Sequence, residues 1–217
     1  MAALIEGPHE AKVERISLTV AGDQVDAIHA RPGGPAATGI VVAPDINGLR
    51  PLFDDLARRL ASHGFAVCVV EPFARIPRAE REGLDVAARM ERGRELRDDV
   101  QLGHLSAAAD YLERTDGVHR VCVLGFCMGG YYTLKAAAGG RFAKAVSCYG
   151  MVRTPPQWQG PGHHSTLDRA AQACPTLAVF GGRDPWTPAE DVEALRSAWR
   201  ERPDCQVVVC PEAEHGF

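Results

Sequence analysis

The chain has 217 residues and a formal net charge of −4, and 24% of its residues are charged. This length suits one α/β domain with a sizeable core. The near-neutral composition contains no basic tract of the kind that nucleic acids or anionic membranes require. No apolar run approaches the length of a membrane span. From these two observations we expect neither a nucleic acid nor a membrane as a partner.

The cysteines predict a reducing compartment. There are seven of them, an odd number, and no two have the CxxC spacing. Most lie inside apolar runs, where a thiol behaves as a small hydrophobic group. We therefore expect free thiols and a cytoplasmic location, without a disulfide framework. The seven are Cys68, Cys122, Cys127, Cys148, Cys174, Cys205 and Cys210.

In chain order, the hydrophobic pattern predicts a hairpin and then strands that alternate with helices. Polar and apolar residues alternate through the first two strands, which is typical of an antiparallel hairpin. The later strands are continuous apolar runs, as in strands buried on both faces, and segments of helical period separate them. This predicts one domain over residues 1–217, with a mainly parallel sheet and helices on both faces. The expected strands are 12–20, 25–30, 39–43, 65–70, 121–124, 142–148, 176–180 and 206–210, and the expected helices are 51–63, 98–114, 131–138 and 188–201.

Two segments do not fit this alternation. Residues 71–97 are rich in arginine and interrupted by proline and glycine, and we expect an insertion over the sheet edge or over a site. Residues 153–168 form a loop that contains His163 and His164. Adjacent histidines rarely point the same way, and no carboxylate has convincing spacing, so we expect no metal site.

The most informative stretch is Gly125-Phe126-Cys127-Met128-Gly129-Gly130, which follows a buried strand and precedes a helix. This is the pattern of a nucleophile elbow, usually built around serine. Glycines are needed there because the central residue is strained and its neighbours pack closely. The helix N-terminus favours a thiolate, so we interpret Cys127 as a nucleophile. The alternative is a tight turn that contains a buried thiol.

Two further residues each follow a predicted strand. Asp184 lies in a glycine-supported loop after 176–180, and His215 lies in the segment after 206–210. Taken singly, Asp184 would be a turn or capping aspartate and His215 a surface histidine. Taken with Cys127, they reproduce the order nucleophile, acid, histidine of α/β-hydrolases. We therefore predict a catalytic triad.

The triad assigns roles to its members. His215 would accept the thiol proton and later protonate the leaving group, while Asp184 would fix the imidazole tautomer. The acyl group would rest on Cys127 as a thioester. The backbone N–H groups of Met128 and Ile46 would bind the oxyanion.

The elbow, Gly182-Arg183-Asp184 and Glu214-His215-Gly216-Phe217 resemble the dienelactone hydrolase family, or carboxymethylenebutenolidases. The loop at 43–48 and the stretch 65–75 are also similar to that family. The resemblance implies an α/β-hydrolase fold without a large cap, no metal or organic cofactor, and hydrolysis of a small lactone or ester.

The resemblance also implies further site residues. The family has a glutamate at the position of Asp45 that pairs with the thiol, and the alternative for Asp45 is a turn residue or a helix cap. Family arginines bind a substrate carboxylate, which implies Arg89 or Arg92 here. Asn47, which lies in the same loop as Asp45, is another substrate-binding candidate. Further substrate-binding candidates are Tyr149 and Trp158, which lie in the region after 142–148.

Three expectations remain open. The family continues beyond the histidine into a helix, so we expect that this sequence is cut short after Phe217. The chain is a monomer or a homodimer. Besides a hydrolase, the same fold admits a non-enzymatic thiol sensor or binding protein, or an acyltransferase in which another acceptor replaces water.

Overall fold

The structure is a computed structural model that describes residues 5–217, and in this part of the chain eight strands form one sheet. Residues 1–4 of the predicted domain lie outside it. The strand order is β1-β2-β4-β3-β5-β6-β7-β8. The hairpin β1–β2 and the pair β2–β4 are antiparallel, and every other pair is parallel. The strands are β1 (Ala11–Val20), β2 (Asp23–Pro32), β3 (Thr38–Ala43), β4 (Ala66–Val70), β5 (Arg120–Phe126), β6 (Ala145–Cys148), β7 (Thr176–Gly181) and β8 (Cys205–Cys210).

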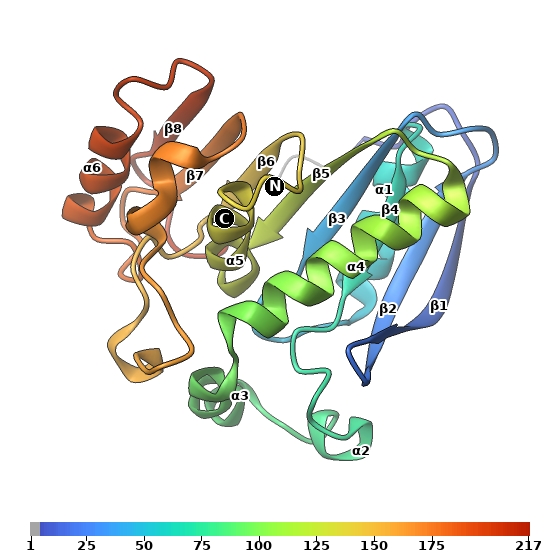
Figure 1. Ribbon diagram of the computed structural model, residues 1–217, viewed down its shortest axis with the longest axis horizontal. Coiled ribbons are helices and arrows are strands. Elements are labelled where there is room, and N and C mark those ends of the chain that lie inside the picture. The colour runs from blue at the N-terminus through green and yellow to red at the C-terminus, as the bar shows by residue number, and fades with distance from the viewer. Residues whose placement is uncertain (1–4) are drawn as a thin grey trace.

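Helices cover both faces of this sheet. Helix α1 packs with β2 and β4 around Phe53 and Ala57, while α4 and α5 cover the opposite face, where Leu112 and Tyr131 are buried. Figure 1 shows α4 lying across the near face, with α1 behind the strands. Among residues 5–217, no helix is both long and apolar enough to cross a lipid bilayer. The α-helices are α1 (Pro51–Ser62), α2 (Arg78–Arg81), α3 (Val86–Arg92), α4 (Asp98–Asp116), α5 (Met128–Ala137) and α6 (Ala189–Ala198), and the 3₁₀ helices are η1 (Gly93–Glu95), η2 (Pro156–Trp158) and η3 (Thr166–Gln172).

The predicted fold class is confirmed, with shifted boundaries. Helix α5 begins at Met128, three residues before the predicted start, because Gly129 and Gly130 belong to the helix and are not part of a preceding turn. A Cβ atom on Gly129 would lie 2.0 Å from the oxygen of Ala43, and one on Gly130 would lie 2.8 Å from the Cα of Gly150. Glycine is therefore required there for close packing of α5, not for flexibility.

The arginine-rich segment lies where an insertion over a site was expected. Helices α2 and α3 lie beyond the end of the sheet toward which β3 and β5 point (Figure 1). In open parallel sheets, binding sites form at the carboxyl ends of the strands. The segment therefore borders the region where chemistry is expected.

Candidate active site

Cys127 lies at the carboxyl end of β5 and is the residue immediately before α5. Its backbone has φ 53° and ψ −118°, a conformation that non-glycine residues rarely adopt. The turn is held because the Cys127 N–H donates to the oxygen of Cys148 at 3.0 Å, while the Cys127 carbonyl accepts from the Tyr131 N–H at 3.0 Å. A Cβ atom on Gly125 would lie 2.2 Å from the oxygen of Gly129. Cys127 is thus fixed in the strained geometry of an elbow.

Two backbone amides point to the Cys127 sulfur, those of Met128 and Ile46. Burial raises the pKa of the Cys127 thiol to about 11, and the charges of Asp45 and Asp184 act in the same direction, whereas the two amides lower it. The Met128 amide at the helix N-terminus thus favours the thiolate, as expected, but burial has the larger effect on the pKa of Cys127. Desolvation of the thiolate outweighs the two amides, so the resting group is the neutral thiol.

Asp184 and His215 are brought together by the loops after β7 and β8. His215 Nδ1 lies 2.8 Å from Asp184 Oδ2. The Asp184 side chain is fully buried, and it also accepts a hydrogen bond from the Trp186 N–H at 2.9 Å. The two loops are in backbone contact, since the Arg183 N–H donates to the Ala213 carbonyl at 2.9 Å. The carboxylate is therefore positioned to orient the imidazole, as predicted from chain order.

Tyr149 borders the histidine. It has φ 41°, and its ring contacts the His215 ring edge-on at 5.2 Å and the Phe217 ring at 5.4 Å. On its other side its ring is 6.0 Å from that of Phe126, the neighbour of Cys127. Tyr149 therefore contacts both the residue next to the elbow nucleophile and the ring of His215.

Asp45 forms an ion pair within its own loop. Arg50 donates from both terminal nitrogens to the two carboxylate oxygens of Asp45, at 2.6 Å each. The Asn47 N–H donates to Asp45 Oδ1 at 2.9 Å, which makes an Asx turn. Asp45 does not cap α1, whose preceding residue is Arg50 with no side-chain cap. Of the open alternatives, the turn residue fits these contacts.

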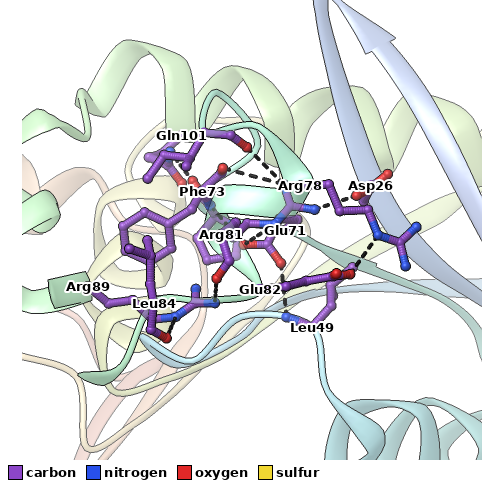
Figure 2. A network of polar contacts seen from close by, with 12 residues as sticks. Asp26, Leu49, Glu71, Phe73, Arg78, Arg81, Glu82, Leu84, Arg89 and Gln101 are labelled. Carbon is purple, nitrogen blue, oxygen red and sulfur yellow. Dashed lines mark hydrogen bonds and ion pairs between the residues drawn. The ribbon is translucent and has the colours of Figure 1, made fainter. Parts of the chain in front are cut away.

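Arg89 and Arg92 lie in different surroundings. Arg92 is partly exposed and pairs with Glu80 and Glu95, at 3.0 and 2.9 Å. Arg89 is buried, and Figure 2 shows its guanidinium donating to the carbonyl oxygens of Leu84 and Arg81, at 3.3 and 2.7 Å.

The Arg89 guanidinium is incompletely paired. Among residues 5–217, its Nη1 has no hydrogen-bond partner, and no carboxylate forms an ion pair with it. Burial lowers the pKa of Arg89. Arg89 and Arg50 line one pocket of about 320 Å³, together with Leu49 and Glu71.

Trp158 is part of the core. It is 1% exposed, and its indole N–H donates to the oxygen of Met90 at 2.8 Å. Gly93 packs against the indole so closely that a Cβ atom there would lie 2.2 Å from Nε1. Trp158 was expected to line the mouth of the pocket. Its large ring instead packs against Gly93 in η1 and links the loop before η3 to the end of α3 through the hydrogen bond to Met90.

The sequence reasoning missed Arg50 and Glu71. Glu71 follows β4 and accepts hydrogen bonds from the backbone N–H groups of Leu49 and Phe73, at 3.0 and 3.1 Å. An available signal was the short spacing of Asp45 and Arg50 around Gly48. Within residues 5–217, no cluster of three or more His, Cys, Asp or Glu side chains has a metal-binding arrangement, and all seven cysteines are free thiols.

The mixed eight-stranded sheet and the placement of Cys127, Asp184 and His215 after β5, β7 and β8 define an α/β-hydrolase. Residues 25–217 match the model of the dienelactone hydrolase family. The chain belongs to the dienelactone hydrolase family.

Relatives and solved structures agree with this assignment. The chain is 31% identical to a protein of Escherichia coli (strain K12) provisionally named carboxymethylenebutenolidase, over 99% of this chain and 81% of that protein. It is 28% identical to the carboxymethylenebutenolidase of Rhodococcus opacus, over 83% of this chain and 70% of the relative. A crystal structure from Klebsiella pneumoniae, provisionally named a dienelactone hydrolase, superposes with a TM-score of 0.86 at 29% identity, covering 95% of this chain and 88% of that one.

Proposed function

We propose that this chain hydrolyses a small lactone or ester through a thioester on Cys127. The observation that carries the proposal is the convergence of the Met128 and Ile46 amides on the Cys127 sulfur, in a site that also holds the Asp184–His215 pair. Two N–H donors from different elements are what a tetrahedral oxyanion requires. The named activity of the relatives supports the same reaction class.

The reaction proceeds in two steps. His215 accepts the thiol proton as Cys127 Sγ forms a bond to the carbonyl carbon, and the negative oxygen is held by the amides of Met128 and Ile46. The carbon–oxygen bond to the leaving group then breaks, and His215 protonates that oxygen. Water, deprotonated by His215, hydrolyses the thioester and restores the thiol. No metal or organic cofactor is used.

Arg89 is the favoured receptor for an anionic group on the substrate. Its buried guanidinium lacks an ion-pair partner within residues 5–217, and it lines the pocket next to Arg50. A carboxylate that entered this pocket would meet the positive charge of the Arg89 guanidinium. Arg92 is less suited because Glu80 and Glu95 already engage it. A carboxylate-bearing lactone or ester is therefore the substrate class that we propose, and the catalytic unit is a monomer or a homodimer.

The thiol-sensor alternative is weaker. Peroxide sensors need an exposed thiolate with a low pKa. Burial instead raises the pKa of Cys127 to about 11.

The test is intact-protein mass spectrometry after brief exposure to activated esters and enol-lactones, together with product analysis. We expect a transient acyl adduct and product release, both lost in Cys127→Ala. The matched control is Cys148→Ala, since burial also raises the pKa of that thiol to about 11 and it lies beside the elbow. If amines release the acyl group from the adduct but water does not, the protein is an acyltransferase. Turnover that persists in Cys127→Ala would refute the proposal.

A further inference from the structure

The two edges of the sheet differ in character. Strands β1 and β8 are its edge strands, and Figure 1 shows them at opposite sides of the sheet. Strand β1 carries Lys12, Glu14 and Arg15, and charged side chains on an edge strand oppose pairing with another strand. Strand β8 has the sequence Cys-Gln-Val-Val-Val-Cys, with no charged residue and no proline. It therefore lacks the features that protect an exposed edge.

The outer backbone groups of β8 are directed away from the sheet. The Asp204 carbonyl accepts a hydrogen bond from the N–H of Thr176 in β7, at 3.2 Å. Because the backbone groups of successive strand residues point to alternate sides, the even-numbered residues of β8 face β7, and Cys205, Val207 and Val209 face outward. Within residues 5–217, no strand pairs with this side of β8. The occupant that fits a row of backbone donors and acceptors is another β-strand.

The outward-facing residues restrict how β8 can pair with a second copy of itself. A closed dimer brings the same strand from both copies together, antiparallel about a two-fold axis. Residues that lie opposite one another must then both face outward or both face β7. Near the middle of the strand, two registers satisfy this condition. One places Val207 opposite Val207 of the second copy, and the other places Val208 opposite Val208.

Charge distinguishes the two registers. With Val208 at the centre, Asp204 of each copy lies beside Glu212 of the other, so that like charges meet. With Val207 at the centre, Arg202 of each copy lies beside Glu212 of the other, and opposite charges meet. The Glu212 side chain is 76% exposed and can take part in such a contact. The register with Val207 on the axis is therefore favoured.

We propose that β8 is a self-pairing surface, through which two copies of this chain form a homodimer with Val207 on the two-fold axis. The N–H groups of Val207 and Val209 then donate to the Val207 and Cys205 carbonyl groups of the second copy. On the open face, Gln206 of each copy lies opposite Val208 of the other, and the Val208 side chain, 43% exposed in the single chain, becomes covered. This dimer is independent of the proposed hydrolase reaction, because none of these residues belongs to its catalytic set.

The test is sedimentation velocity of the full chain across a dilution series. The native chain should show a reversible equilibrium between monomer and dimer. Val208→Lys with Gln206→Lys places lysine opposite lysine twice in the dimer, whereas Val208→Lys with Gln206→Glu places lysine opposite glutamate. The first double variant should raise the Kd of the dimer at least about tenfold, and the second should stay within about threefold of the native Kd.

Two further variants act as controls. Ser17→Lys with Thr19→Lys adds the same charge at the β1 edge and should leave the Kd unchanged. Val207→Pro removes an outward N–H group, which an edge strand tolerates, and should also abolish the dimer. Urea denaturation checks that each variant is folded, as expected for the exposed positions 206 and 208.

Three results would overturn the proposal. The first is a native chain that remains monomeric throughout the series or forms only large aggregates. The second is a dimer that persists in the lysine–lysine variant, since the contact would then lie elsewhere. The third is equal weakening in both double variants, which is the result that the register with Val208 opposite Val208 predicts.

Discussion

Asp98 and Lys135 form a buried ion pair between the first turn of α4 and the last part of α5. Their side chains are 5% and 6% exposed, and the Lys135 Nζ lies 2.7 Å from both Asp98 oxygens. Asp98 also accepts the His164 N–H at 2.7 Å, and Lys135 Nζ lies 4.0 Å from the centroid of the Tyr131 ring. Because α5 carries Cys127 at its start, this pair anchors the helix on which the site is built.

Asp98→Asn leaves the Lys135 ammonium buried without its carboxylate. Removing one partner of a buried pair destabilises a protein by about 3–5 kcal/mol. For a chain of this length, each kcal/mol lowers Tm by about 2–4 °C, so Tm should fall by about 6–20 °C.

The effect of Asp98→Asn should depend on pH. Burial already lowers the pKa of Lys135, and loss of the carboxylate lowers it further. The unfolded chain then binds more protons than the folded chain, so stability rises with pH in this range. The loss of stability caused by Asp98→Asn should therefore be smaller at pH 9.5 than at pH 7.

Urea denaturation at both pH values measures this prediction. The matched control is Asp99→Asn, the next residue, whose pair with Arg97 is exposed to solvent and should contribute little to stability. The double variant Asp98→Leu with Lys135→Met removes both charges and should be much more stable than Asp98→Asn alone. A loss below 1 kcal/mol in Asp98→Asn, or a double variant that is less stable still, would refute the reasoning.

Three further predictions concern the site itself. The log rate of Cys127 alkylation should rise by about one unit per pH unit up to about pH 10, because the pKa of the buried thiol is about 11, and a plateau below pH 8 would contradict this. Asp184→Asn should lower kcat by about 10²–10⁴-fold with little change in KM, since it removes the acceptor that fixes the His215 tautomer. Steady-state kinetics with an unchanged kcat would count against the triad. Gly129→Ala should destabilise the fold by at least about 1–3 kcal/mol, because its Cβ atom would lie 2.0 Å from a backbone oxygen of β3. An unchanged urea midpoint would show that the helix–strand contact is looser than described.

The sequence by itself determined the α/β class, the family and the positions of Cys127, Asp184 and His215 relative to the strands. These follow from short-range signals. Continuous apolar runs define buried strands, and the glycines around Cys127 define a turn that few other residues permit. The sequence also placed the Met128 and Ile46 amides near the nucleophile, because chain order in such a sheet fixes which loops meet at its carboxyl edge.

Tertiary structure decided what surrounds each side chain. The pKa of Cys127 is raised because burial outweighs the helix dipole, and burial cannot be read from a loop motif. Asp45 pairs with Arg50 in a loop that Glu71, more than twenty residues away, supports by accepting a hydrogen bond from the Leu49 N–H. Trp158 lies in the core because a distant glycine leaves room for its ring. Such contacts depend on side chains from separate elements packing together, and local sequence patterns carry no information about that packing.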